Sequence, residues 1–387
     1  MKRIRKITVF AITGLLLAFI FTACDAEPKT VGELLEIMEK SPSEEKAELL
    51  IRRINKNDSF PIVEDSGVFF IYSGKSDSAV SLTGDMNSWD NEGIRMSRIE
   101  GTDIYFTKQS YIENARLEYK FIIDGKYITD PLNKVTDIGG YGENSVLMMP
   151  LYVFPKSILY RQLAVSGKLD TVNFKSDILN NTRNIYVYSH PKCVKSSPLI
   201  VFHDGSDYLK FGYTKTILDN LIDEGKIPPL NALFVDPANR QKEYWINDNY
   251  LKMIFRELLP YVLKKYDLNP SQTGMVGASL GGLISFYALK DYGHKLNFVY
   301  SQSGAFWVED EAILKEISEF SEINTKIYFD YGSFERVDES HKNIFDALNK
   351  HGIRYSSRVY NEGHNWGNWR AHLGLILQDI LKEESKN

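Results

Sequence analysis

Residues 277–282 have the sequence GASLGG, which places a serine in a turn built from small residues. The segment 273–276 before the turn is typical of a buried strand, and the apolar segment 283–289 after it is typical of a helix. A turn this tight between a strand and a helix admits only small residues beside the serine, and it pushes the hydroxyl away from the backbone. We therefore predict that Ser279 is a nucleophile and that the backbone N–H of Leu280, at the start of the helix, stabilises the oxyanion that forms when the serine attacks a carbonyl group.

A serine nucleophile needs a general base, because a neutral alcohol is a weak nucleophile. The candidate is His364, in the segment GHNWGNW at residues 363–369, which lies between the last predicted strand and the last predicted helix. Two other histidines are alternatives. His203 ends an early strand, where it can shape a loop, and His341 is expected on the exposed side of a helix. We therefore predict that His364 is the general base.

The base in turn needs a carboxylate that orients its ring and stabilises its charged form. In chain order this acid should lie between the serine and the histidine, after the strand predicted at residues 326–330. Glu335 is the predicted acid. Asp338 and Asp330 are alternatives, because acidic residues near the start of a helix also have a purely structural role.

A second oxyanion donor is expected in the loop that follows the early strand at residues 199–203. The loop contains the glycine that such a turn needs, and the N–H of Gly205 or Ser206 is the predicted donor. Four further residues are candidates for the walls of a substrate pocket, where aromatic rings would suit an aryl or sugar ester, although each could equally pack in the core: Arg240, Trp307, Trp366 and Trp369.

These residues fall in the part of the chain where strands alternate with helices, residues 153–387. Such alternation predicts an α/β domain with a mostly parallel central sheet that is covered on both faces. In sheets of this kind the functional side chains gather at the carboxyl ends of the strands. The strands are predicted at residues 185–188, 199–203, 232–236, 273–276, 298–301, 326–331 and 358–360.

Residues 59–152 have a different pattern, with short β-branched and aromatic runs separated by turn residues. Asp124 and Gly125 stand between two such runs and predict a type I′ hairpin turn. We expect an independent all-β sandwich of the immunoglobulin-like class here. The preceding segment 25–58 has apolar residues at helical spacing and is predicted to be a tether and lead-in helix.

The first residues of the chain have the layout of an export signal. A basic segment at residues 2–6 is followed by an apolar segment at residues 7–23 and then by Cys24. A cysteine at this point resembles that of a bacterial lipoprotein signal, in which the thiol carries the lipid anchor. A plain secretory peptide or a single anchor helix is the alternative, and every one of these readings places the folded part outside the cytoplasm.

The composition excludes some classes of function. The chain has a formal net charge of −5 and a pI near 5.9, so it has no excess of positive charge that could neutralise a nucleic-acid backbone. The second cysteine, Cys193, is expected to be an unpaired thiol without a catalytic role, because it has no partner at metal-ligand spacing. The chemistry predicted for the serine needs no metal and no organic cofactor.

The β-rich region resembles the early-set, immunoglobulin-like modules that precede glycogen-branching enzymes and many bacterial esterases. Some of those modules bind starch-like sugars, and Trp89 is the residue here that could serve as a sugar platform. The alternative is that Trp89 and the turn around it hold the sandwich together and orient the neighbouring domain. The segments that carry the resemblance are GDMNSW at 84–89, YKFIIDG at 119–125 and DPLN at 130–133.

The region after it resembles the esterase D or enterochelin-esterase-like family of α/β-hydrolases. This family includes siderophore, feruloyl and acetyl-xylan esterases as well as mycolyl transferases, and its acid usually stands three residues after a glycine. Gly332 and Glu335 satisfy that spacing. The matching segments are FVDPANR at 234–240, EY at 243–244, ELLP at 257–260, GASLGG at 277–282, SQSGAFW at 301–307 and GHNWGNWR at 363–370.

The resemblance implies an α/β-hydrolase that cleaves carboxylic esters, whether small molecules or polysaccharide esters, at a membrane surface to which a lipid on Cys24 holds it. Two alternatives remain open. One is a carbohydrate-binding or adhesion lipoprotein on an inactive esterase fold, which would predict loss of a triad member. The other is an acyltransferase, because the same triad transfers an acyl group to an alcohol when water is excluded.

Overall fold

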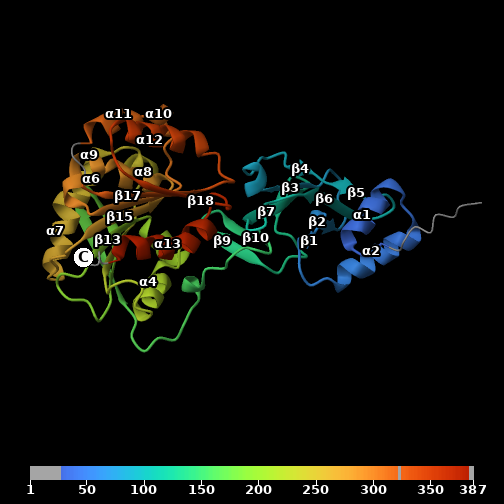
Figure 1. Ribbon diagram of the computed structural model, residues 1–387, viewed down its shortest axis with the longest axis horizontal. Coiled ribbons are helices and arrows are strands. Elements are labelled where there is room, and N and C mark those ends of the chain that lie inside the picture. Colours follow the sequence, from blue (N-terminus) through green and yellow to red (C-terminus); the bar gives the residue numbers. More distant parts are fainter. Residues whose placement is uncertain (1–27, 321–323, 383–387) are drawn as a thin grey trace, which may run out of the picture.

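The computed structural model describes residues 28–320 and 324–382. A narrow N-terminal part and a larger C-terminal part lie one after the other along the long axis of the molecule (Figure 1). The predicted signal segment and Cys24 lie outside the described residues. Within the described ranges, none of the helices combines the length and apolar character needed to cross a bilayer.

The lead-in segment forms two helices, α1 (Val31–Lys40) and α2 (Glu44–Lys56), where one helix was predicted. Ser43 accepts a hydrogen bond from the N–H of Lys46 and so caps a new helix after the break. The apolar faces of both helices pack on a sheet that contains β2 (Gly67–Ser73) and β6 (Ile104–Gln109), so the helices are part of a hydrophobic core and not only a tether. The shared cluster contains Leu34, Leu35, Met38, Leu50 and Ile54 from the helices, and Phe69, Ile71, Ile104 and Phe106 from the sheet.

The N-terminal part is a sandwich of two antiparallel sheets, which we call the front module together with α1 and α2. The turn at Asp124 and Gly125 joins β7 (Arg116–Ile123) to β8 (Lys126–Ile128) with φ angles of 48° and 73°, so the predicted hairpin is confirmed. The first sheet has the order β1 (Ile62–Glu64), β2 (Gly67–Ser73), β6 (Ile104–Gln109), β5 (Ser97–Arg98). The second has the order β4 (Ile94–Arg95), β3 (Ser81–Gly84), β7 (Arg116–Ile123), β10 (Gly142–Met148), β9 (Thr136–Gly139), with β8 (Lys126–Ile128) beside β7.

The C-terminal part is built on a sheet that has eight strands in the described chain. Strands β11 (Lys168–Ser176) and β12 (Asn181–Ser189) pair antiparallel at one edge, and every pairing from β14 (Asn231–Val235) to β18 (Ser356–Tyr360) is parallel. The order is β11 (Lys168–Ser176), β12 (Asn181–Ser189), β14 (Asn231–Val235), β13 (Leu199–His203), β15 (Thr273–Ala278), β16 (Phe298–Gln302), β17 (Lys326–Gly332), β18 (Ser356–Tyr360).

Helices cover both faces of this sheet. Both faces are apolar, since successive apolar side chains of a buried strand point to opposite faces. In β13, Leu199 and Val201 belong to one apolar cluster, whereas Ile200 and Phe202 belong to the other. The first cluster is closed by α6 (Asp248–Lys252), the π-helical turn Met253–Leu258, α7 (Leu259–Lys265), α8 (Leu280–Tyr287), α9 (Leu289–Tyr292) and α12 (Asp338–Lys350). The second is closed by α3 (Gly205–Lys210), α4 (Thr214–Asp223) and α13 (Trp366–Leu381) (Figure 1).

Candidate active site

Ser279 lies in a sharp turn between the central strand β15 and helix α8. Its backbone has φ 55° and ψ −119°, a conformation that a residue with a side chain rarely adopts and that costs about 1–3 kcal/mol. Two backbone hydrogen bonds hold it there: the N–H of Ser279 donates to the carbonyl of Gln302 at 2.9 Å, and its own carbonyl accepts from the N–H of Ala305 at 3.0 Å. The end of strand β16 and the segment that follows it thus fix the strained turn.

The glycines of this turn are required by close packing. A Cβ atom on Gly277 would lie 2.1 Å from the carbonyl oxygen of Gly281, and one on Gly282 would lie 2.6 Å from Oγ of Ser301. Leu280 is the first residue of α8, so its N–H has no partner inside the helix and points to the space beyond the helix end. The strand, the turn and the helix that the sequence predicts here are confirmed.

His364 and Glu335 contact each other directly. Nδ1 of His364 lies 2.7 Å from Oε2 of Glu335, whose side chain is fully buried, whereas about a third of the imidazole is exposed. With Nδ1 donating its proton to the carboxylate, the lone pair of Nε2 is left to accept a proton from an alcohol. The pairing is the one that a general base requires.

Glu335 is held by donors on its other oxygen. Oε1 accepts hydrogen bonds from the N–H of Gly332 at 2.7 Å, from Oγ of Ser303 at 2.7 Å and from Nδ2 of Asn368 at 3.3 Å. Every partner donates, which suits an ionised carboxylate that can only accept. Glu335 therefore has the fixed orientation that it would need to orient the histidine.

The alternative acid Asp330 has a different partner. Its carboxyl group is buried and accepts a hydrogen bond from the hydroxyl of Tyr300. Burial, which disfavours the charged form, raises the pKa of Asp330 to about 8. A carboxyl group with that pKa and that partner supports the packing between β16 and β17, while Glu335 carries the bond to His364.

The two alternative histidines are both fully buried. Nδ1 of His203 lies 2.9 Å from the hydroxyl of Tyr250, and burial lowers the pKa of His203 to about 3. His341 packs against the rings of Phe306 and Tyr331, and burial lowers its pKa to about 4. The expectation that His341 lies on the exposed side of its helix was wrong, because α12 turns that face toward the sheet.

The loop after β13 lies close to the neighbouring strand. Asp204 has φ 54°, and a Cβ atom on Gly205 would lie 2.4 Å from the backbone of Phe234 in β14. The N–H of Ser206 donates to Oδ1 of Asp236 at 2.7 Å. The N–H of Ser206 thus holds the loop, which favours Gly205 over Ser206 as the predicted oxyanion donor.

Arg240 links this loop to the strand that carries Ser279. Its Nε lies 2.9 Å from Oδ1 of Asp204, its Nη2 lies 2.8 Å from Oδ2 of the same carboxylate, and Nη2 also lies 3.4 Å from the carbonyl oxygen of Ala278. The guanidinium is partly exposed, so it can also face a substrate. Sequence reasoning missed Asp204, which has no local pattern that distinguishes it from any other loop acid.

The three tryptophans have different surroundings. Trp307 is 46% exposed, and the centre of its ring lies 6.2 Å from that of His364. Trp369 is buried, donates from Nε1 to Oγ of Ser303 at 2.9 Å and meets the His364 ring edge-on at 5.1 Å. Trp366 is buried against Tyr208. Trp307 is therefore the tryptophan best placed to touch a substrate, and the surroundings of the other two favour packing.

A model of the family described as "Putative esterase" matches residues 176–380, more than half of the chain. The chain belongs to this esterase family. The Iron(III) enterobactin esterase of Escherichia coli strain CFT073 is 25% identical over 344 residues, which cover 78% of this chain and 85% of that protein. The uncharacterized protein YbbA of Bacillus subtilis is 25% identical over 181 residues, covering 42% of this chain and 69% of YbbA. The protein is thus an ester hydrolase.

Solved structures share the fold of both parts. The enterochelin esterase of Shigella flexneri superposes with a TM-score of 0.70 at 22% identity, covering 83% of this chain and 94% of that one. The ferric enterobactin esterase of Salmonella typhimurium gives a TM-score of 0.73 at 20% identity, covering 84% and 97%. These coverages exceed the family match of residues 176–380, so the similarity in fold includes the front module as well as the C-terminal part.

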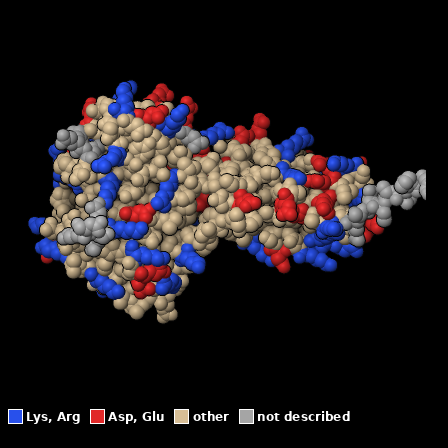
Figure 2. Space-filling model, viewed as in Figure 1, with Lys and Arg blue, Asp and Glu red and all other residues tan. Residues whose placement is uncertain are grey.

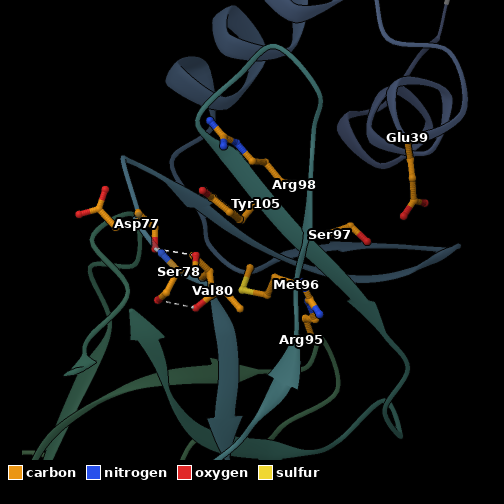
Figure 3. A pocket seen from close by; sticks show the side chains of 11 residues that line it. Glu39, Asp77, Ser78, Val80, Arg95, Met96, Ser97, Arg98 and Tyr105 are labelled. Atoms are coloured by element: carbon orange, nitrogen blue, oxygen red, sulfur yellow. Dashed lines mark hydrogen bonds between the residues drawn. The ribbon is translucent and has the colours of Figure 1, made fainter. Parts of the chain in front are cut away.

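The front module has a hollow of its own. Its volume is about 640 Å³, and Figure 3 shows it between α1 and the strands, with Arg95, Ser97 and Arg98 on one side and Asp77 and Ser78 on another. Trp89, the candidate sugar platform, is not among the residues that line it. The hollow therefore lends no support to a sugar site built around Trp89.

Among the residues that the structure describes, no three His, Cys, Asp or Glu side chains are grouped so as to hold a metal ion. On the face seen in Figure 2, positive and negative side chains are interspersed over both parts of the molecule. This face therefore has no basic stripe that could bind a phosphate backbone.

Proposed function

We propose that the protein is an extracytoplasmic serine esterase that cleaves carboxylic esters through an acyl-enzyme, with Ser279 as nucleophile, His364 as general base and Glu335 as the acid that orients it. One observation carries the proposal: the 2.7 Å bond between Nδ1 of His364 and a buried Glu335, in a chain that also holds a serine at φ 55° between a central strand and a helix. A purely structural role would require neither a strained serine in this turn nor a buried carboxylate bonded to the histidine. A catalytic triad requires both.

The proposed reaction has two halves. Oγ of Ser279 attacks the carbonyl carbon of the ester while Nε2 of His364 takes its proton, and the N–H groups of Leu280 and Gly205 stabilise the oxyanion of the tetrahedral intermediate. The intermediate collapses with loss of the alcohol, which receives the proton from His364. Water, deprotonated by the same nitrogen, then attacks the acyl-serine, and the carboxylic acid leaves as Ser279 regains its proton.

The substrate that we propose carries an aryl or sugar group, as siderophore esters and feruloylated polysaccharides do. Trp307 offers an exposed ring beside His364, and Arg240 offers a cation that can meet an acidic or phenolic group. The relatives named as enterobactin esterases support the aryl reading. We also propose that the front module is of the immunoglobulin-like, early-set type and that Cys24 carries a lipid that holds the enzyme on a membrane outside the cytoplasm.

The test is hydrolysis by the protein lacking residues 1–24, with the variant S279A in parallel. The panel contains short-chain p-nitrophenyl esters, methyl ferulate, acetylated xylan and a catecholate trilactone. We expect turnover of at least one ester, with kcat reduced by about 10³-fold or more in S279A, because the triad acts as a unit. Turnover that S279A retains in full, or a folded protein that turns over no ester on the panel, would overturn the proposal.

A further inference from the structure

The segment that carries His364 is held from outside its own domain. This segment, residues 361–365, connects β18 to α13, and we call it the histidine loop. The N–H of Arg116 in β7 donates to the carbonyl of Asn361 at 3.0 Å, and Nδ2 of Asn361 donates to Oδ1 of Asn114 at 2.8 Å. Both partners belong to the front module, so one end of the histidine loop is attached to the sandwich and not only to its own sheet.

The other end of the histidine loop is attached through the residue next to His364. Nδ2 of Asn365 donates to Oδ2 of Asp85 at 2.9 Å, and Oδ1 of Asn365 accepts from Nη1 of Arg116 at 3.3 Å. Oδ1 also accepts from the N–H of Asn368 and so caps α13. Asn365 therefore donates from Nδ2 to one front-module side chain, Asp85, and accepts at Oδ1 from another, Arg116.

Two glycines of the GHNWGNW motif leave room for these front-module side chains. A Cβ atom on Gly363 would lie 2.1 Å from Cγ of Asp85, and one on Gly367 would lie 2.1 Å from Nη1 of Arg116. Neither glycine has a positive φ, so backbone conformation does not require them. The contact between the two parts of the molecule requires them instead.

Asp85 is itself rigidly held. It is 4% exposed, its Oδ1 accepts from Nε1 of Trp89 at 2.9 Å, and its Oδ2 accepts from the N–H of Glu118 at 2.7 Å as well as from Asn365. The turn that carries Asp85 is closed by Asn87, whose Oδ1 accepts from the N–H of Gly84 at 2.9 Å. The conspicuous GDMNSW segment thus has a structural task, with Trp89 fixing the carboxylate that meets the histidine loop.

Buried charge pairs reinforce the same contact. Arg116 also pairs with Asp137 of β9 and with Glu118, while Arg370 of α13 pairs with Asp137 across the interface. Nη1 of Arg116 lies 3.8 Å from Oε2 of Glu362 in the histidine loop. Pairs of this kind tolerate little displacement, because moving one partner leaves an uncompensated buried charge.

We propose that Asp85 is a positioning residue for His364: from the front module, through Asn365 and against Gly363, it fixes the histidine loop in the place where the imidazole can serve Ser279. The front module is then part of the catalytic apparatus and not an accessory ligand-binding module. This inference rests on the proposed function, since it assigns the task of general base to His364.

The decisive variant is D85N, measured in the detergent-solubilised full chain. Asparagine keeps the shape of the side chain but has a single accepting oxygen for the three donors that now converge on the carboxylate. We expect kcat for p-nitrophenyl acetate to fall by about 10- to 100-fold with KM within about twofold, because small displacements of a catalytic group reduce kcat steeply.

Two further variants separate positioning from folding. D130N changes another buried carboxyl group of the front module, which accepts hydrogen bonds from the hydroxyl of Tyr119 and from the N–H of Leu132, both within the front module. It should lower Tm but keep kcat at a temperature where the protein is folded. N365S loses the bond to Asp85 but keeps a side chain that can cap α13, and the double variant D85N/N365S should lose no more activity than the worse single variant.

The rate at which Ser279 reacts with a fluorophosphonate probe gives a second readout that needs no natural substrate. If wild type is labelled and D85N is labelled equally fast, or if D130N loses as much kcat as D85N at the same folded fraction, the inference is wrong while the proposed function stands. If wild type neither hydrolyses esters nor reacts with the probe, the proposed function fails and the inference fails with it. Slow labelling of D85N alone, with KM unchanged, supports the positioning role.

Discussion

At the scale of single residues, the chemistry depends on contacts between side chains that are far apart in the chain. Glu335 accepts from Ser303 and faces His364, and Trp369 donates to the same Ser303 hydroxyl. The sequence predicted Ser279, His364 and Glu335 because each stands at a fixed offset from a strand end. It could not predict Ser303, because a serine that bonds a buried acid has no local pattern that sets it apart.

The carboxylate of Glu335 can be tested at this same scale with E335Q. The amide keeps an oxygen for the donors around Glu335 but removes the negative charge that stabilises the imidazolium, so we expect kcat to fall by about 10²- to 10⁴-fold with a small change in KM. The matched control is D330N, which changes the alternative acid that bonds Tyr300. Steady-state kinetics on p-nitrophenyl butyrate decide the assignment, and a larger loss of kcat in D330N than in E335Q would reverse it.

At the scale of elements, local periodicity predicted the strands well but not which face of a helix is buried. The hairpin turn at Asp124 and Gly125 and the strand before Ser279 follow from patterns of a few residues. The break between α1 and α2 and the burial of His341 do not, because each depends on how a helix meets a sheet that is distant in sequence.

The packing of α12 makes the stability of the fold sensitive to acid. Burial lowers the pKa of His341 to about 4, so the folded state keeps this ring neutral while the unfolded chain binds a proton below its ordinary value of 6.5. Between those two values the unfolded state holds more protons, so the free energy of unfolding should fall as pH falls. One such group contributes at most about 1.4 kcal/mol per pH unit.

Urea unfolding at pH 7 and pH 4.5 measures this effect in H341F, which has an apolar ring in the same cluster. We expect H341F to lose less stability than wild type on acidification, although losing the bond between Nδ1 and the carbonyl of Val337 lowers its stability at pH 7 by about 1 kcal/mol. The same change at the exposed His351, just after α12, should leave the acid sensitivity of wild type intact. Equal acid sensitivity in H341F and wild type would contradict the argument.

At the scale of the whole molecule, the two parts meet through polar contacts that sequence patterns do not show. The pairing of Asp137 in β9 with Arg370 in α13 joins residues on opposite sides of the domain boundary, and a polar interface of this kind leaves no apolar stripe in either segment. The sequence therefore predicted two domains, one after the other, but not that the front module reaches the active site. In Figure 1 the hairpin of β9 and β10 points toward the C-terminal part.

The tip of this hairpin brings a front-module residue close to Arg240. Gly139 lies against Trp366, and Tyr141, at the tip, has its side chain fully exposed. Burial disfavours the charge of Arg240, but its bonds to Asp204 raise the pKa of the guanidinium overall, and the phenol of Tyr141 is near enough to add to that rise. Tyr141 therefore stands in solvent beside the cation that joins the loop after β13 to the strand of Ser279.

An exposed tyrosine in that place should contact the part of a substrate that extends beyond the scissile ester. We expect Y141A to raise KM for methyl ferulate or a catecholate trilactone by about 3- to 10-fold, since one aromatic contact contributes about 0.5–1.5 kcal/mol beyond its buried area. Its kcat and KM for p-nitrophenyl acetate, which is too small to reach the hairpin, should stay as in wild type. Y160A removes a comparably exposed tyrosine from the segment between the two parts and serves as the control. If Y141A and Y160A give the same KM for every ester, the front module positions the histidine loop without touching the substrate.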